Sequence, residues 1–309
     1  MLKPIIALAP MADYTDRPFC LLCREISGTD FVIYREMVSS VAIVRDNEKT
    51  LSMCEIDRRE HPVIIQIFGD DPSVMARAAK IIVERFQPDG IDINMGCPVP
   101  KVAQKTKSGA ALMKYPDLAV EIVRAIKNEN LGVPLSVKTR LGWSNDGEIF
   151  DFAKRLEKAG VELIAIHGRT KVQGYSGESN WQRIGEVKKI LGIPVVANGD
   201  IHSKEDIEKC LSITGADGVM IGRGALGNPW IFAKSSESIG LKQIVKTIIR
   251  HAELHIEHYG DRGIVTLRKH LVWYFNGDRT QGVSGIKKLR AELVRISNLD
   301  ELNAILSSL

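Results

Sequence analysis

The chain has 309 residues, of which 44% are hydrophobic and 26% are charged, a composition typical of folded globular proteins and not of disordered or fibrous ones. No apolar run approaches the roughly 20 residues that span a bilayer, and the opening MLKPIIALAP has too short an apolar stretch for a signal peptide. We therefore expect a cytoplasmic protein without membrane contact, built as one large domain with at most one appendage.

The cysteines argue against a disulfide framework. There are five, an odd number, and they are scattered along the chain, which suits a reducing compartment. Cys20 and Cys23 form a C-x-x-C pair, but the second pair that a tetrahedral metal site would need is missing. We interpret both as packing residues of a helix, and we predict no metal site.

Eight short apolar runs bounded by Gly, Pro, Asn or Asp predict strands. They are 5–10, 31–34, 63–68, 91–94, 135–138, 163–168, 195–200 and 218–222. Stretches with helical spacing separate them, for instance 71–86, 115–129, 147–160 and 203–215. This alternation indicates an α/β fold, a closed parallel (β/α)8 TIM barrel in residues 1–235. An open, doubly wound sheet is the alternative.

The C-terminal segment has a different pattern. Residues 241–260, 266–277 and 285–297 have helical spacing with no strand signal between them, so we predict an all-helical domain in residues 240–309 after a linker near 235–240. This segment holds eleven Lys and Arg against seven Asp and Glu, and so carries the whole net charge of +4. The asymmetry indicates a polyanionic partner, although solvated helix faces would also produce it.

Polar residues follow most of the predicted strands. In parallel barrels the reactive groups gather at the carboxyl ends of the strands, where the loops converge on one mouth. The residues in such positions are Gln66, Asn94, Cys97, Lys138, Arg140, His167, Arg169, Asn198, Gly199, Asp200, Gly222 and Arg223. Any one of them could simply close a strand end by hydrogen bonding, but so many together predict a site.

The segments ANGDI (197–201) and IGRGAL (221–226) predict a phosphate site, because the last strands of such barrels often supply glycine N–H groups and a helix N-terminus. Gly199, Gly222 and Arg223 are what a phosphate monoester needs. The ligand could be a sugar phosphate or flavin mononucleotide (FMN). With FMN, Lys138 and His167 could hold the electron-rich N1/C2=O edge of the flavin, where a positive charge stabilises the reduced anion.

Several segments form a longer pattern that runs in order through nearly the whole chain. They are LAPMADYTDRPF (8–19), IDINMGCPVPKVAQKTKSGAAL (91–112), VKTRLGW (137–143), IHGRT (166–170), YSGESNW (175–181), PVVANGDI (194–201), GVMIGRGALGNPWIF (218–232) and RKHLVWY (268–274). The Asn-x-Gly-Cys-Pro core around Cys97, with Gly109-Ala110 after it, is highly specific. In these segments the chain resembles the tRNA-dihydrouridine synthases of the bacterial type.

The resemblance implies FMN as cofactor, NADPH or NADH as electron source, and a D-loop uridine of tRNA as substrate. Reduction of the uracil 5,6 double bond needs hydride at C6 and a proton at C5. We expect Cys97 to donate the proton, as a thiol with a pKa near neutrality held by the Gly96 turn and Pro98. Asn94 is expected at the uracil edge or the flavin. The expected cofactor contacts are Pro10, Met11, Ala12, Gln66, Lys138, His167, Asn198, Gly199, Asp200, Gly222 and Arg223.

The tRNA needs further contacts, because a uridine must leave the folded tRNA to reach a barrel mouth. Arg140 and Arg169 are candidates at the exposed mouth for phosphates of FMN or RNA, and Lys101 is a candidate for RNA. On the helical domain the candidates are Arg268, Lys269, Lys287, Lys288, Arg290 and Arg295. Trp273 and Tyr274 are interpreted as helical core rather than as platforms for stacked bases.

Two other functions are compatible with parts of the pattern. A small-molecule FMN barrel of the dihydroorotate dehydrogenase kind also pairs a flavin with a Cys or Ser near a pyrimidine, but it has no reason to carry a basic helical tail. A non-catalytic RNA-binding barrel would use the same pocket residues structurally.

Overall fold

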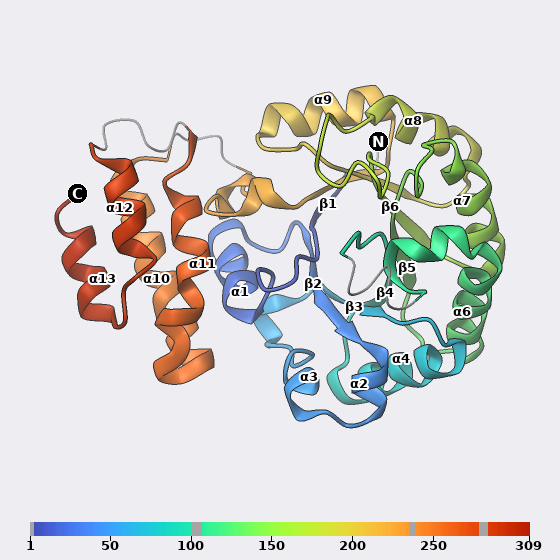
Figure 1. The fold of residues 1–309 in the computed structure, drawn as a ribbon, viewed down its shortest axis with the longest axis horizontal. Helices are drawn as coiled ribbons and strands as arrows, with labels where there is room; N and C mark the ends of the chain where they lie inside the picture. The colour runs from blue at the N-terminus through green and yellow to red at the C-terminus, as the bar shows by residue number, and fades with distance from the viewer. Residues whose placement is uncertain (1–2, 100–106, 235–238, 278–283) are drawn as a thin grey trace.

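The computed structural model describes residues 3–99, 107–234, 239–277 and 284–309, and its centre is a closed barrel of eight parallel strands (Figure 1). Each strand pairs with the next in the chain, and β1 closes the ring by pairing with β8 from Ile5↔Gly218 to Leu8↔Ile221. The strands are β1 Ile5–Leu8, β2 Val32–Ser39, β3 Val63–Phe68, β4 Gly90–Met95, β5 Leu135–Arg140, β6 Leu163–His167, β7 Val195–Asn198 and β8 Gly218–Ile221. The predicted (β/α)8 barrel is confirmed, and the doubly wound sheet is wrong.

Helices follow the strands and cover the outside of the barrel (Figure 1). The α-helices are α1 Arg17–Ser27, α2 Ser40–Val44, α3 Glu48–Ser52, α4 Pro72–Phe86, α6 Pro116–Asn128, α7 Glu148–Ala159, α8 Trp181–Ile190 and α9 Lys204–Thr214, and the short 3-10 helices are η1 Arg58–Glu60, η2 Gly109–Lys114, η3 Arg223–Ala225 and η4 Pro229–Phe232. Local sequence starts these helices. Asp71 accepts hydrogen bonds from Ser73 and Val74 at the start of α4, and Ser203 and Asp206 form a capping box on α9.

The strand side chains alternate between the barrel interior and the helix-covered outer face. Outward residues such as Ile93 and Val137 belong to the large core beneath the helices. The interior holds a second apolar cluster, which includes Tyr34, Ile64 and Met220. Because this apolar cluster fills the barrel below the mouth, a ligand can approach the strand ends from the mouth side only.

A helical region follows the barrel and lies to one side of it, beside α1 (Figure 1). It consists of α10 Leu241–Tyr259, η5 Gly260–Arg262, α11 Gly263–Tyr274, α12 Ile286–Leu293 and α13 Leu299–Leu306. Its core also takes in Leu21 and Leu22 of α1 and Trp230 of η4. The predicted helical character is confirmed. The boundary at 235–240 stays a prediction, because residues 235–238 lie outside the described residues.

Gly227 lies at a close approach between the barrel and α11. Its φ of +62° is in the left-handed region, and a Cβ at this position would lie 2.2 Å from the backbone carbonyl carbon of Trp273, so only glycine fits. Tyr274 is fully buried in the helical core, as predicted. The prediction for Trp273 is wrong, since its side chain packs against the barrel core and lines the barrel mouth instead.

The packing of α1 confirms that Cys20 and Cys23 are packing residues of a helix. Cys20 and Cys23 are fully buried there among apolar side chains.

Among the described helices, none has the length and apolar character needed to cross a membrane.

Candidate active site

A cavity of about 430 Å³ opens at the C-terminal mouth of the barrel, a size typical of small-molecule sites. A larger groove of about 990 Å³ lies beside α1 and α10 and contains none of the predicted site residues. The mouth cavity is lined by Pro10, Met11, Ala12, Gln66, Asn94, Cys97, Lys138, Arg140, His167, Asn198, Gly199, Asp200, Gly222 and Arg223. The fold therefore brings residues that are distant in sequence to one place.

Cys97 lies just beyond the end of β4 in a turn that Asn94 holds. The N–H groups of Cys97 and Gly96 donate to Asn94 Oδ1 at 2.9 and 3.2 Å, and the N–H of Ala110 donates to the Cys97 carbonyl at 3.1 Å. Burial raises the pKa of the half-buried thiol above its ordinary value of 9.0. The expected pKa near neutrality is thus wrong, and the thiol keeps its proton at neutral pH.

A chain of hydrogen bonds inside the barrel supports this turn. Asn94 Nδ2 donates to Gln66 Oε1 at 2.7 Å, and Gln66 Nε2 donates to Asp92 Oδ2 at 2.6 Å. Ser136 Oγ donates to the other oxygen of Asp92, also at 2.6 Å. Sequence analysis missed Asp92 and Ser136, although an acidic residue in the middle of an apolar strand was a visible signal. Their effect is to fix the orientation of both amides beneath Cys97.

Asp92 makes folding stability depend on pH. Burial raises its pKa from 3.8 to about 6, despite the hydrogen bonds from Gln66 and Ser136. Between these two values the folded chain holds a proton that the unfolded chain has lost, so the free energy of unfolding falls as pH rises, by roughly 3 kcal/mol in all. We expect Asp92→Asn to remove this part of the pH dependence. Denaturant unfolding of flavin-free protein from about pH 4 to about pH 7 measures it, and an unchanged slope in the variant would contradict the assignment.

Lys138 and His167 lie on neighbouring strands but differ in charge. Burial and the Arg140 guanidinium lower the pKa of Lys138 to about 8, so it remains a cation at pH 7. Burial, with the nearby Lys138 and Arg140 charges, lowers the pKa of His167 well below its ordinary value. Arg169 Nη1 lies 3.3 Å from His167 Nε2 and can only donate, so Nδ1 carries the proton. Of the two residues, Lys138 therefore supplies the positive charge, and His167 offers a neutral N–H.

Arg140 and Arg169 are not exposed as predicted, since each is only 3% exposed. Arg140 donates to the carbonyls of Gly96, Thr170 and Gly174 at 2.8 to 3.0 Å. Arg169 donates to the carbonyls of Ser176 and Gly177 and pairs with Asp200 at 2.7 Å. These guanidinium groups hold the loop after β6 against the mouth. Arg140 still lines the cavity, whereas Arg169 lies outside its lining.

Tyr175, in the loop after β6, is a cavity residue that sequence analysis did not single out. The residue is 60% exposed and lines the mouth. The guanidinium of Arg223 lies 4.6 Å from the ring centroid, and that of Arg140 lies 5.7 Å from it. An exposed aromatic ring next to two guanidinium groups is a candidate contact for a planar ligand. Its sequence signals were its place in the YSGESNW segment (175–181) and an aromatic residue in a Gly- and Ser-rich loop.

The ends of β7 and β8 provide the candidate phosphate site. Asn198 Nδ2 donates to the Met220 carbonyl at 2.6 Å, which joins the two strand ends. Arg223 is exposed beside Gly222, and no described carboxylate forms an ion pair with it. An accessible guanidinium without an internal anion suits an anionic ligand.

Gly199 is a position in this part of the mouth where a side chain cannot fit. Its φ is +115°, and a Cβ would lie 2.5 Å from Ser179 Oγ and 2.7 Å from His167 Cδ2. We expect Gly199→Ala to displace His167 and to weaken ligand binding at the mouth, at a stability cost of about 1–3 kcal/mol. Gly132→Ala is the matched control, because Gly132 also has a positive φ, +74°, but has open space around it. Equal ligand affinity in the two variants would contradict a role for the close approach.

The residues predicted to contact RNA lie in different settings. Lys101 lies outside the described residues. Arg268 donates to the Ile296 carbonyl at 2.7 Å, Lys269 lies 3.5 Å from the buried Asp16, and Arg290 donates to Asn276 Oδ1 at 2.6 Å. Arg268 and Arg290 thus hold the helical region together, and Lys269 joins it to α1, whereas Lys287 and Lys288 are exposed on α12.

The fold and the cavity define a (β/α)8-barrel protein with its candidate active site at the C-terminal mouth, where enzymes of this fold carry out their chemistry. The model of the family described as dihydrouridine synthase matches residues 7–308. The chain belongs to the dihydrouridine synthase family and is an oxidoreductase. The family predicted from the sequence motifs is therefore confirmed.

Relatives cover nearly the whole chain. A probable tRNA-dihydrouridine synthase of Aquifex aeolicus is 37% identical over 97% of this chain and 94% of its own length. A probable tRNA-dihydrouridine synthase 1 of Synechocystis is 40% identical over 95% and 82%, and the tRNA-dihydrouridine synthase B of Pseudomonas aeruginosa is 36% identical over 96% and 89%. Among solved structures, a 2-naphthoyl-CoA reductase matches with a TM-score of 0.57 at 13% identity, over 74% of this chain and 49% of its own. This last likeness shows the barrel fold alone.

Proposed function

We propose that the protein is a tRNA-dihydrouridine synthase that reduces the 5,6 double bond of a D-loop uridine, with FMN as cofactor and NADPH or NADH as electron source. Family membership supports the reaction, and so do the names of the relatives. The observation that carries the proposal for this chain is the cavity itself, which places Cys97 together with all the residues expected to contact the flavin.

The cavity residues fit FMN in chemistry. Arg223, Gly222 and Gly199 would hold the phosphate at the ends of β7 and β8. Lys138 would face the N1/C2=O edge, where its positive charge favours the reduced form, and the neutral His167 would donate a hydrogen bond nearby. Bound there, FMN would supply the hydride that reaches C6 of the uracil.

Cys97 is the proposed proton donor. Its thiol stays protonated at neutral pH because burial raises its pKa, so it can give the proton to C5 once C6 has been reduced. Asn94 fixes the turn from one side, and Arg140 Nε fixes the Gly96 carbonyl from the other at 2.8 Å. This double restraint keeps the thiol in one position and so favours protonation of one ring face.

The helical region is the proposed tRNA-binding part of the chain. Its net positive charge would attract the tRNA backbone, with Lys287 and Lys288 as exposed phosphate contacts. Arg268, Lys269 and Arg290 would contribute mainly by holding these helices in place, and Lys101 remains a proposed contact on the loop after Cys97. Binding should weaken with salt, because each phosphate contact releases counterions.

An anaerobic spectrum tests the proposal. The purified protein is expected to show a flavin band that NADPH or NADH bleaches, and the band is expected to return rapidly on mixing with unmodified tRNA. Fumarate and orotate serve as control acceptors. Reoxidation by either small molecule and not by tRNA would indicate a small-molecule reductase, and absence of a bound or bindable flavin would overturn the cofactor assignment.

A further inference from the structure

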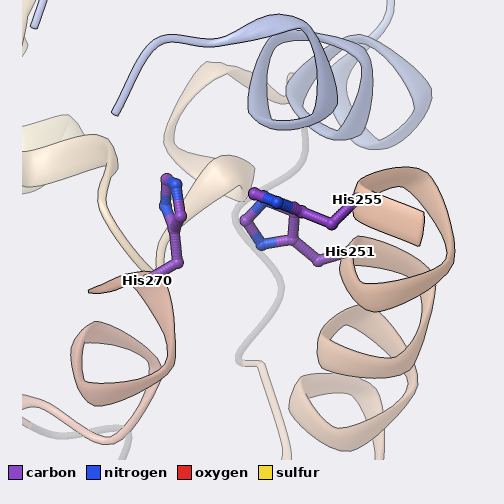
Figure 2. A group of neighbouring side chains, drawn as sticks. All are labelled: His251, His255 and His270. Carbon is purple, nitrogen blue, oxygen red and sulfur yellow. The ribbon is translucent and has the colours of Figure 1, made fainter. Parts of the chain in front are cut away.

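Three histidines meet inside the helical region, and none of them lines the mouth cavity. His251 and His255 lie one turn apart on α10, and His270 faces them from α11 (Figure 2). All three are fully buried. One ring nitrogen of each lies within 4.8 Å of the others. We propose that His251, His255 and His270 bind a structural Zn²⁺ ion.

The hydrogen bonds of His255 direct a lone pair into the cluster. Thr266 Oγ1 donates its proton to the Gly263 carbonyl at 2.8 Å, so toward His255 it can only accept. His255 Nδ1, at 2.8 Å from Thr266 Oγ1, must therefore carry the ring proton. The Nε2 atom of His255 is left unprotonated, and it faces His251. A histidine whose outer nitrogen donates to a fixed acceptor has the arrangement usual for a metal ligand.

His251 is held in the same way. Its Nδ1 lies 3.0 Å from the Tyr274 hydroxyl, and its Nε2 lies 3.2 Å from His255 Nε2. Two nitrogens on a tetrahedral Zn²⁺ ion, each about 2.0–2.1 Å from the metal, are roughly 3.3 Å apart. The observed separation is close to this value. Because a tyrosine hydroxyl can donate or accept, His251 can present either a proton or a lone pair to the cluster.

His270 supplies the independent indication of a ligand. Both of its ring nitrogens are buried without a hydrogen-bond partner among the described residues. A neutral imidazole has one N–H and one lone pair, and a buried ring with neither satisfied is rare in folded proteins. The Phe19 ring stacks on it at 5.1 Å and Tyr14 packs edge-on at 5.3 Å. A metal ion bound by one nitrogen would explain why this imidazole is retained in an aromatic environment.

The surroundings of the cluster suit zinc. Asp16 is buried nearby, close enough to act on His255 and His270, and its carboxylate would offset part of the ion's charge. Imidazole nitrogens are good ligands for Zn²⁺. Three histidines leave a fourth position, which a water molecule would fill.

The ion would join α10 to α11 where both pack on α1. Lys269, next to His270, pairs with the α1 cap residue Asp16 at 3.5 Å, so the cluster lies at the junction between the helical region and the barrel. Because the three ligands are fully buried, the ion must enter while the chain folds. The proposed role is therefore structural, and it does not depend on the flavin or on tRNA.

The test is the metal content of the full-length protein, purified without a polyhistidine tag after growth with added zinc. Elemental analysis after gel filtration in mild chelator is expected to find one zinc per chain. Growth with cobalt instead should give the visible bands of tetrahedral Co²⁺ at wavelengths beyond those of a flavin. Wild-type protein that carries no stoichiometric zinc and shows no cobalt band would overturn the proposal.

Three variants separate ligation from general folding. His270→Gln is expected to lose the bound metal, whereas His258→Gln, on α10 with His251 and His255 but outside the cluster, is expected to keep it. Thr266→Val removes the acceptor for His255, together with the hydrogen bond from Thr266 Oγ1 to the Gly263 carbonyl, and should weaken metal binding by about 10- to 100-fold. If His270→Gln does not fold, a metal titration of Thr266→Val still tests whether the histidines bind the ion. Undiminished metal affinity in Thr266→Val, or full metal content in a folded His270→Gln, would contradict the assignment.

Discussion

Replacement of Cys97 by alanine is expected to slow reoxidation of the reduced protein by unmodified tRNA by about 10²- to 10⁴-fold, the usual contribution of a positioned general acid. Reduction of the flavin by NADPH should keep its rate, because Cys97 is proposed to act on the uracil alone. Stopped-flow absorbance of each half-reaction under anaerobic conditions measures the two rates separately. The large effect is expected because the raised pKa keeps the thiol protonated and Asn94 holds its turn.

Cys210→Ala is the matched control for this prediction. Cys210 is fully buried on α9 and does not line the cavity, so its replacement tests for a general effect of losing a cysteine. It should leave both half-reactions close to wild type. Slowing of both half-reactions in Cys97→Ala would indicate damage to the cavity, and a normal rate with tRNA would exclude Cys97 as the acid.

Lys138→Met is expected to reduce the rate of flavin reduction by NADPH by about 10²- to 10³-fold, as is typical when a single preorganised electrostatic contact is removed. The reason is that Lys138 is the cavity cation proposed to face the flavin edge that becomes negative on reduction. Loss of a charged hydrogen bond of about 1.5–3 kcal/mol should also lower the two-electron midpoint potential by roughly 30–65 mV. Spectroelectrochemical titration of the bound flavin measures this shift.

Lys114→Met is the control for Lys138→Met. Lys114 is exposed, and its ammonium lies 4.9 Å from the Trp143 ring centroid, outside the cavity lining. The Lys114→Met variant removes one positive charge from the protein without changing the proposed flavin contacts. If both variants shift the potential equally, the effect comes from net charge, and the placement of Lys138 at the flavin edge is wrong.

The barrel fold and the identity of most residues at its mouth were predictable from sequence, because both follow from local rules. Apolar runs ending at Gly, Pro, Asn or Asp mark the strands, and in a parallel barrel all carboxyl ends meet at one mouth. Lys138, His167 and Arg223 could thus be placed together although they are far apart in the chain. The charge on His167 could not be predicted, since it depends on burial and on the position of Arg169.

Contacts made by irregular loops could not be predicted from pattern. Arg140 and Arg169 are buried because residues 170–177 fold over them and present backbone carbonyls, and no periodicity encodes such a loop path. The histidine cluster shows the same limit. The spacing of His251 and His255 places them on one helix face, but the approach of His270 depends on how α11 packs against α10.

Through Trp273, the helical region contributes to the lining of the mouth cavity together with the barrel. Its side chain lines the cavity from α11, while its backbone is in close contact with Gly227 of the barrel. A ligand that touches this indole must therefore be coupled to the docking of the helical region. Linkage requires the effect to be reciprocal: whatever the docked helices add to ligand affinity, the ligand adds to the stability of their docking. Occupancy of the mouth and orientation of the helices that would receive tRNA thus form one equilibrium.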